Sequence, residues 1–418
     1  MTGGAPSPAQ QAVLEAVADR GVEIVNRAVA WADIPSGSRN FGGLEEQRIA
    51  LAQVLGGLPG ALETVPLAPT VEVDAAGREV ALAHPDALRL TVRPEAPVQV
   101  VLTGHYDTVY AADSAFRHVS TRNDGALHGP GIADMKGGLS VMLAALEAFE
   151  GFDGRDALGY RVLLSPDEEL GSPASRALLA ELGRLGHVGL TYEPALGDGA
   201  LAAARKGSGN FHVLIIGKAA HAGRDFLSGR NAVAAAARLA TRLADLNGGR
   251  EGVTLNVARI DGGGPLNVVP DTAVLRFNVR APQPADLDWA QAQIEAAVAA
   301  AQGDGLIARL FGGFTRPPKP FVAAQQRLFE AIAETGGMIG QEIAWAASGG
   351  VCEGNNLFAA GLPNADSLGV RGGAIHSDQE HAWPDSFVER AQLSALILMR
   401  LATGEIDGPG LRAALAEA

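Results

Sequence analysis

The strongest constraint on the fold is a set of short apolar runs separated by a helical stretch. Val98–Gly104 (VQVVLTG) is nearly continuous in β-branched and other apolar residues, which is typical of a strand covered on both faces. Tyr160–Ser165 (YRVLLS) and Val188–Tyr192 (VGLTY) repeat the pattern, and residues 138–150 between the first two have helical spacing. This alternation predicts an α/β layer around a mainly parallel sheet.

Two other regions have their own periodicity. Apolar positions at helical spacing over residues 8–31 and 44–58 predict that the chain opens with two helices. From about residue 205, the pattern predicts the β-α-β-β-α-β order of a split ferredoxin-like unit. Its elements are expected at residues 211–217, 230–247, 252–261, 273–281, 284–302 and 306–312.

The domain boundaries follow from these changes in rhythm. The proline-rich segment 316–320 (RPPKP) marks a linker, after which the sequence returns to helix-rich α/β character. We therefore expect a catalytic domain over residues 1–204 and 319–418, interrupted by an inserted domain over residues 205–318.

The composition indicates which binding partners and which cellular compartment to expect. The 418 residues are 47% hydrophobic and 19% charged, the balance of a globular protein with a sizeable core. The net charge is −14, so we expect neither a nucleic-acid nor an anionic membrane partner. No apolar run reaches the roughly 18 residues that span a bilayer, and no signal-peptide pattern is seen. The single cysteine, Cys352, predicts a buried reduced thiol in a cytoplasmic protein, or in a periplasmic one if a leader was removed.

Polar residues stand at the ends of the early strands, where open α/β sheets bind ligands. His105 and Asp107 follow the first strand in GHYDTV, and an aspartate so placed can fix the second ring nitrogen of a histidine ligand. Asp134 stands in HGPGIADMKGG, where it would either cap the next helix or point above the sheet. Asp107 and Asp134 are therefore candidates for a site at this edge.

Acidic residues follow the other two strands. Asp167, Glu168 and Glu169 come directly after YRVLLS, and Glu193 ends VGLTYE. Carboxylates packed side by side raise one another's pKa unless a cation or a proton intervenes. His376 stands much later, in GAIHSDQEH. Each of these residues taken singly also fits a surface loop or a structural role.

Together, the two histidines and three carboxylates form a mixed nitrogen and oxygen ligand set that suits zinc, with Co²⁺ or Mn²⁺ as substitutes. Five ligands are too many for one catalytic zinc, but they fit two metals that share one carboxylate and a water. Glu168 is then left next to a ligand, where it can take a proton from that water. A calcium site is disfavoured because Ca²⁺ takes oxygen ligands. The five are His105, Asp134, Glu169, Glu193 and His376.

These residues resemble a known family, the co-catalytic zinc metallopeptidases. The family includes glutamate carboxypeptidase, acetylornithine deacetylase, succinyl-diaminopimelate desuccinylase and aminoacylase. The resemblance covers about residues 20–402, and the family's motifs occur in order as GHYDTV, GIADMKGG, PDEELGS, TYEP, GKAAHAG, NVVP, NVR and IHSD. RKGSGNF and GKAAHAG lie closest to the glutamate carboxypeptidase-like branch.

The resemblance implies a role for each metal ligand. Asp134 would bridge two zinc ions in each subunit. His105 and Glu193 would complete one site, and Glu169 and His376 would complete the other.

The resemblance also implies the catalytic residues. Asp107 would orient His105, and Glu168 would be the general base that activates the water and returns its proton to the leaving amine. His221 in GKAAHAG would donate a hydrogen bond to the developing oxyanion from the lid of the partner subunit. A homodimer formed through the inserted domain is therefore expected.

Other matched positions would hold the free carboxylate of the substrate. Asn267 and Arg280 lie in LNVVP and FNVR, and a guanidinium fork suits a carboxylate. The backbone amides of Gly349 and Gly350 would approach the same carboxylate, and Arg316 would be a further arginine at the hinge of the lid.

Two departures from the family concern the substrate. Glu353 stands in SGGVCEGN where relatives more often have aspartate, which affects the shape of that loop. After Glu193 no lysine occurs before Lys206, whereas the folate-hydrolysing glutamate carboxypeptidase has one earlier to meet a second carboxylate. The lack of this lysine argues for hydrolysis without a strict preference for glutamate, and the run LAAA could accept an apolar side chain.

The sequence thus predicts a zinc-dependent amidohydrolase acting on a small peptide or an N-acyl amino acid. A glutamate carboxypeptidase-like exopeptidase is the first choice, and an N-acyl-amino-acid deacylase is the alternative. A non-hydrolytic binding protein on the same scaffold is a further alternative, which the presence of all five ligands and Glu168 argues against.

Overall fold

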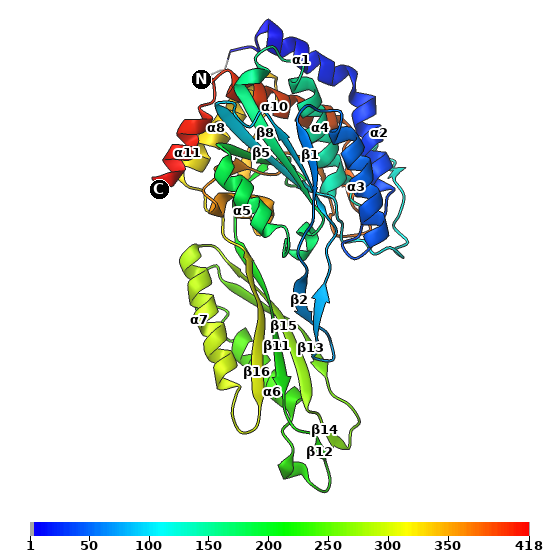
Figure 1. The fold of residues 1–418 in the computed structure, drawn as a ribbon, viewed down its shortest axis with the longest axis vertical. Coiled ribbons are helices and arrows are strands. Elements are labelled where there is room, and N and C mark those ends of the chain that lie inside the picture. Colours follow the sequence, from blue (N-terminus) through cyan, green and yellow to red (C-terminus); the bar gives the residue numbers. More distant parts are fainter. Residues whose placement is uncertain (1–3, 418) are drawn as a thin grey trace. The chain divides into compact units, whose positions relative to one another are not determined.

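The computed structural model describes residues 4–417 and divides them into two compact units (Figure 1). Unit 1 contains the described residues up to Leu67, then His84–Ala204 and the described residues from Phe321 onward. Unit 2 contains Ala68–Ala83 and Arg205–Pro320. The sequence pattern did not predict that residues 68–83 join the later segment.

Unit 1 is built on a six-stranded sheet with the order β1-β4-β8-β5-β9-β18. Strand β5 pairs in parallel with both β8 and β9, and β18 is parallel to β9. Strand β4 is antiparallel to both of its neighbours, so it alone runs against the other strands of this sheet. The expected mainly parallel α/β sheet is confirmed. The bounds are β1 (Ala61–Val65), β4 (Ala87–Val92), β5 (Val98–His105), β8 (Leu158–Ser165), β9 (Val188–Thr191) and β18 (Asn364–Ala365).

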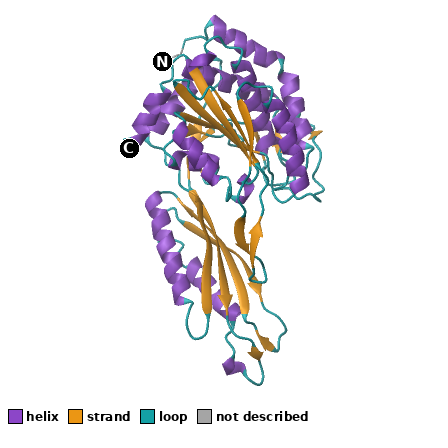
Figure 2. Ribbon diagram, viewed as in Figure 1, coloured by secondary structure: helices purple, strands orange, loops and turns teal. Residues whose placement is uncertain are grey.

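Helices pack on both faces of this sheet (Figure 2). Val100 and Leu102 of β5 join the main core, while Val101 between them joins a second core on the other face. This is why the sequence of β5 is nearly continuously apolar. The helices are α1 (Pro8–Asp19), α2 (Gly21–Ala32), α3 (Phe41–Leu55), α4 (Gly138–Phe149), α5 (Arg176–Leu185), α8 (Ala323–Met338), α9 (Glu353–Ala359), α10 (Asp385–Ala402) and α11 (Gly408–Ala416).

The prediction of one helix over residues 8–31 was wrong, because the segment forms α1 and α2. Arg20 separates them with φ −98° and ψ 11°, which lies outside the helical region. No proline marks the break, and the apolar spacing continues through it, so periodicity alone did not show it.

A small four-stranded sheet of unit 1 contacts the helical turn η1 through strand β20. Its order is β19-β20-β7-β6, and the segment between β19 and β20 carries His376. The bounds of these and the remaining short elements of unit 1 are β6 (Ser120–Thr121), β7 (Leu127–His128), β19 (Gly372–Gly373), β20 (His381–Ala382), β10 (Leu201–Arg205), β17 (Trp345–Ser348) and the short helical turns η1 (Ile132–Gly137), η2 (Arg155–Ala157) and η3 (Glu168–Leu170).

Unit 2 has a four-stranded antiparallel sheet with the order β13-β15-β11-β16. Two helices pack on one face, where Phe211 and Ile215 meet Leu239 and Ile294. The main elements follow the β-α-β-β-α-β order that the sequence predicts. They are β11 (Gly207–Ile216), α6 (Ala232–Ala244), β13 (Thr254–Gly262), β15 (Thr272–Ala281), α7 (Pro284–Ala300) and β16 (Ile307–Arg316).

The other face of this sheet is partly covered by the hairpin of β2 (Thr70–Val73) and β3 (Glu79–Leu82). Val73 packs on Leu214 and Val274, and the Arg276 guanidinium donates a hydrogen bond of 2.9 Å to the Val73 carbonyl. This hairpin is why residues 68–83 belong to unit 2. Two short strands, β12 (Ala220–His221) and β14 (Val268–Val269), pair with each other beside the turn η4 (Phe226–Ser228).

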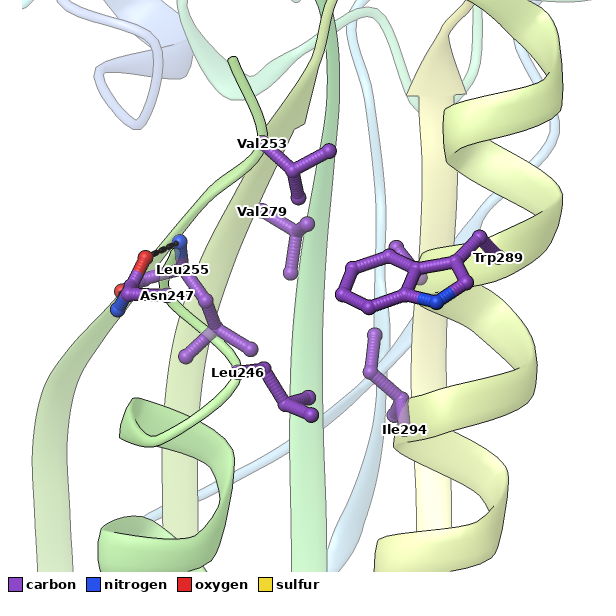
Figure 3. A pocket seen from close by; sticks show the side chains of 8 residues that line it. Leu246, Asn247, Val253, Leu255, Val279, Trp289 and Ile294 are labelled. Atoms are coloured by element: carbon purple, nitrogen blue, oxygen red, sulfur yellow. Dashed lines mark hydrogen bonds between the residues drawn. The ribbon is translucent and has the colours of Figure 1, made fainter. Parts of the chain in front are cut away.

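A small apolar pocket lies within unit 2 (Figure 3). Asn247 at its edge bonds to both backbone groups of Leu255, accepting from the amide and donating to the carbonyl at 2.8 Å each. The pocket lining consists of Leu246, Asn247, Val253, Leu255, Val279, Trp289, Ala290 and Ile294. Among the described residues of either unit, no helix is long and apolar enough to cross a membrane.

Candidate metal centre and active site

The candidate residues meet at the carboxyl edge of the unit 1 sheet because of the strand order. His105 is the last residue of β5, the strand that lies between β8 and β9. Glu169 follows the end of β8, and Glu193 follows the end of β9. Since these three strands are parallel, their ends lie at the same edge.

One group consists of His105, Asp134 and Glu193, whose ligand atoms lie within 4.8 Å of one another. Nε2 of His105 is 3.2 Å from Oδ1 of Asp134 and 3.9 Å from Oε2 of Glu193. All three side chains are buried. The group therefore offers one ring nitrogen and two carboxylates to a common point.

The second group consists of Asp134, Glu169 and His376. Nε2 of His376 is 3.3 Å from Oδ2 of Asp134 and 3.2 Å from Oε2 of Glu169. Asp134 thus belongs to both groups and turns a different oxygen to each. It does not cap the next helix, because the N-cap of α4 is Gly137.

The electrostatics of the two groups show an excess of negative charge. Burial and the nearby charge of Asp134 raise the pKa of Glu169 to about 8. Burial also acts to raise the pKa of Asp134, but hydrogen bonds from His105 and His376 outweigh it and lower that pKa. The same contacts with Asp134 and Glu169 raise the pKa of His376 to about 10. The raised pKa values mean that bound protons reduce the repulsion between the carboxylates, and a cation in each group would do the same.

Two unpaired atoms test whether metal ions fit. Oε1 of Glu169 and Oε1 of Glu193 are buried and have no hydrogen-bond partner, and each belongs to a different group. A buried carboxylate oxygen without a partner is costly, and coordination to a cation would satisfy it. Histidine nitrogen with carboxylate oxygen is also a donor set that suits zinc. The residues present therefore fit two metal ions that share Asp134.

Asp107 connects the histidine of one group to the carboxylate of the other. Nδ1 of His105 lies 3.0 Å from the backbone carbonyl of Asp107 and 3.4 Å from its Oδ1. The two carboxylate oxygens of Asp107 accept hydrogen bonds of 3.2 Å from the backbone amides of Glu168 and Glu169. The hydroxyl of Ser38 donates a further bond of 2.8 Å. This is the arrangement that an orienting carboxylate requires.

Comparison with known proteins identifies the family. The sequence pattern of peptidase family M20/M25/M40 matches residues 101–400. The chain belongs to this family. It is therefore a hydrolase of the M20 type, and M20 enzymes depend on metal ions.

Relatives in the M20 family have two kinds of activity in their names. Carboxypeptidase G2 from Pseudomonas sp. (strain RS-16) is 31% identical over 316 residues, which are 73% of this chain and 74% of the relative. Succinyl-diaminopimelate desuccinylase from Rhodospirillum rubrum is 29% identical over 73% of this chain and 82% of the relative. The crystal structure of human carnosine dipeptidase 1 is 16% identical, with a TM-score of 0.70 over 94% of this chain and 100% of that one, and shows the shared fold.

The three acidic residues after β8 have separate positions in this M20 chain. Asp167 accepts hydrogen bonds from the amides of Ala174 and Ser175, so it shapes the turn before α5. Glu169 joins the second metal group, and Glu168 directly precedes it in η3. Only Glu168 is thus placed beside a candidate ligand without being one.

Four predicted residues of the M20 site lie in unit 2 rather than with the metal groups. His221 on β12 is exposed, and the amide of Ala222 donates to the carbonyl of Asn267 at 2.9 Å, so His221 and Asn267 are neighbours. Arg280 on β15 and Arg316 on β16 each pair with Ser208 of β11 from opposite sides. These residues form two sets within the unit.

The remaining predicted positions lie in unit 1 and follow β17. Gly349 and Gly350 are exposed, and the amide of Gly350 donates to the Ser348 hydroxyl at 3.2 Å. Glu353, where the sequence departs from the family, is fully buried at the start of α9 and accepts from the hydroxyl of Ser165 at the end of β8. Cys352 next to it is buried, as expected.

The sequence did not single out Ser38, Tyr110 or Glu380. Ser38 contacts Asp107, and Tyr110 donates a hydrogen bond of 2.6 Å to Glu380. The one available signal for Glu380 was its place in the motif GAIHSDQEH, four residues after His376.

Proposed function

We propose that the chain is a two-zinc amidohydrolase that cuts a C-terminal peptide bond or the amide of an N-acylated amino acid and releases a free amino acid. The observation that carries this proposal is that the two carboxylate oxygens of Asp134 face different histidines. Oδ1 lies 3.2 Å from Nε2 of His105, and Oδ2 lies 3.3 Å from Nε2 of His376. A carboxylate shared in this way is suited to bridge two metal ions.

Two Zn²⁺ per subunit are the proposed cofactors, and Co²⁺ or Mn²⁺ are expected substitutes. When bound, two such ions lower the pKa of a water molecule and polarise the scissile carbonyl. Asp107 holds the ring of His105 in place through the contact at Nδ1. The proposed ligands are His105, Asp134 and Glu193 for one ion and Asp134, Glu169 and His376 for the other.

Glu168 is the proposed general base. Its backbone amide donates to Asp107, and it directly precedes Glu169 of the second group in η3, which supports this role. The carboxylate takes a proton from the attacking water, and returns it to the nitrogen of the leaving amine. The released amine and the new carboxylate are then the two products.

Unit 2 is the proposed source of the residues that hold the substrate. Arg280 and Asn267 would supply a guanidinium fork and an amide for the free carboxylate, with the buried Arg316 as a further arginine, and the backbone of the exposed Gly349 and Gly350 would approach the same group. His221 stabilises the developing oxyanion from the partner subunit of a homodimer formed through unit 2. The exposure of His221 supports this role, because the side chain is accessible to a second copy.

Two substrate classes compete under this proposal. The match to carboxypeptidase G2 over 73% of the chain favours an exopeptidase. The lack of a lysine between Glu193 and Lys206, together with the match to a succinyl-diaminopimelate desuccinylase, favours an N-acyl-amino-acid deacylase. Both classes use the same metals, base and carboxylate-binding residues, and differ in the acyl group.

Release of free amino acid from a panel of substrates tests the proposal. The zinc-loaded protein is incubated with folyl-glutamate, benzoyl-glutamate, dipeptides and N-acetyl amino acids, and each reaction is repeated with a chelator and with Glu168→Gln. Chelator-sensitive release from folyl- or benzoyl-glutamate supports the exopeptidase. Release from small acyl groups alone supports the deacylase, and release that persists in the chelator contradicts the metal proposal.

A further inference from the structure

Glu380 is a fully buried carboxylate that the proposed reaction does not use directly. It stands immediately before β20, in the same segment as His376. Four donors surround its two oxygens, which are the backbone amides of Gly131, Ala133 and Asp134 and the hydroxyl of Tyr110. Because a carboxylate has about four acceptor positions, this set occupies Glu380 completely. Glu380 is therefore not itself available as a metal ligand.

The three amides belong to the turn that carries Asp134. Oε1 of Glu380 accepts from Ala133 and Asp134 at 2.9 Å each, and Oε2 accepts from Gly131 at 3.0 Å. Gly131 has φ 70°, a conformation that favours glycine and allows these amides to converge on one point. The position of the Asp134 backbone is thus set by Glu380.

The other end of the connection is the segment that carries His376. The Tyr110 hydroxyl also lies 2.8 Å from the Ser377 carbonyl, and Nε2 of His128 lies 2.8 Å from the Asp378 carbonyl. His376 itself has φ 63° and a half-exposed side chain, and its ring contacts Asp134 and Glu169. Glu380 therefore ties the loop of His376 to the turn of Asp134, two ligands of the second group.

The first group has a different support. His105 belongs to β5, which is paired on both sides, and Asp107 holds its Nδ1. Glu193 lies two residues after the end of β9 in the same sheet. In the first group, Glu380 helps to fix the backbone position of Asp134 alone. In the second group, it helps to fix the positions of both Asp134 and His376.

We infer that Glu380 is a positioning residue that sets the affinity of the second metal position, the one formed by Asp134, Glu169 and His376. The inference rests on the proposed binding of two metal ions. Partners of this kind, which hold a ligand without touching the metal, typically change metal affinity by about 10–100-fold when they are replaced.

Metal titration of Glu380→Gln tests the inference without using activity. Zinc-free protein is titrated calorimetrically with Zn²⁺, and bound zinc is counted by elemental analysis after dialysis against a zinc buffer. We expect wild type to retain two ions and Glu380→Gln to retain one, with the weaker site losing about 10–100-fold in affinity and the tighter site changing much less. The matched control is Glu389→Gln. Glu389 lies on α10, and its carboxylate is paired with Arg371. This variant should retain both ions.

The outcomes separate this inference from the proposed function. Wild type that binds fewer than two ions would overturn the two-metal proposal and this inference with it. Glu380→Gln that keeps both ions, or that weakens both sites equally, would overturn the role of Glu380 alone. If Glu380→Gln does not fold, Glu380→Asp keeps the charge but falls short of the amides, and should show the same selective loss; retention of both ions by that variant would also overturn the inference.

Discussion

Oδ2 of Asp107 accepts a hydrogen bond of 3.2 Å from the backbone amide of Glu169. The carboxylate that lies 3.4 Å from Nδ1 of His105 therefore also contacts the backbone of a ligand in the other metal group. The two candidate metal positions are thus coupled through Asp107 as well as through Asp134.

Replacement of Asp107 by asparagine should weaken both metal positions. An amide group has only one acceptor oxygen. If the nitrogen replaces Oδ1, the contact with His105 and the bond from the Glu168 amide are lost, and if it replaces Oδ2, the bonds from the Glu169 amide and Ser38 are lost. We expect a loss of about 10–100-fold in zinc affinity at both positions, measured by calorimetric titration. Ser38→Ala, which removes only the bond of 2.8 Å to Asp107, is the control and should cost less. Wild-type affinity in Asp107→Asn would show that Asp107 does not orient the ligands.

Glu168→Gln should separate metal binding from turnover. The amide keeps the size of the side chain but cannot take a proton, so bound zinc should remain at two ions while kcat falls by about 10²–10⁴-fold. Elemental analysis and release of free amino acid measure the two quantities on one sample. A variant with wild-type kcat would remove Glu168 from the role of general base.

His221 offers a test of catalysis across a dimer. If His221 acts on the partner's site, a heterodimer of His221→Ala and Glu168→Ala contains one site in which both residues are intact. Differently tagged chains purified as a heterodimer should then regain a large part of wild-type activity, while each variant alone stays inactive. If His221 acts within its own chain, neither site is intact, and a verified heterodimer without activity would contradict the proposal.

The core of the fold could be predicted because its signals are local. The run Val98–Gly104 is apolar at every position that faces either of two cores, and β5 forms there. Strand β1 (Ala61–Val65) gave no such signal, because its side chains are exposed or only half-buried. The hairpin Thr70–Leu82 was missed for a related reason, since it buries chiefly Val73 against the distant residues Leu214 and Val274.

The candidate ligands could be recognised because metal chemistry restricts residue types to histidine and carboxylates at strand ends. Glu380 could not, because its partners are the backbone amides of Gly131, Ala133 and Asp134. Every residue type except proline carries such an amide, so nothing in the sequence marks which ones converge on a carboxylate. Its role becomes visible only when the turn and the loop of His376 are placed together.

Asn247 should contribute to the stability of unit 2. Its side chain accepts from the amide of Leu255 and donates to the carbonyl of Leu255 (Figure 3), and it also donates to Ala244 at 3.1 Å. Asn247→Ala leaves the nearly buried backbone of Leu255 without these partners, and we expect a loss of about 1–3 kcal/mol in the free energy of unfolding. Urea denaturation measures it. Asn247→Asp keeps the acceptor for the Leu255 amide but turns a second oxygen toward the carbonyls of Leu255 and Ala244, so it should also be less stable than wild type. Equal stability of all three proteins would contradict the prediction.

His187 should make the stability of unit 1 depend on pH. Its Nδ1 accepts a hydrogen bond of 2.9 Å from the backbone amide of Gln99, so this atom must be unprotonated in the folded state. Burial, assisted by the charge of Arg412, lowers the pKa of His187 below the ordinary 6.5. As the pH falls through 6.5 the unfolded chain therefore takes up a proton before the folded chain does, and stability declines toward the lowered pKa. Above that window both states are neutral and the effect is absent.

The variant His187→Asn isolates this effect, because an asparagine oxygen can accept the same bond from Gln99 and does not titrate. The difference in Tm between wild type and His187→Asn should be constant above about pH 7 and should shift in favour of the variant as the pH falls to about 5. Zinc-free protein is used for both, so that loss of metal at low pH does not enter the comparison. A difference in Tm that does not change between these pH values would show that His187 is protonated to the same extent in both states.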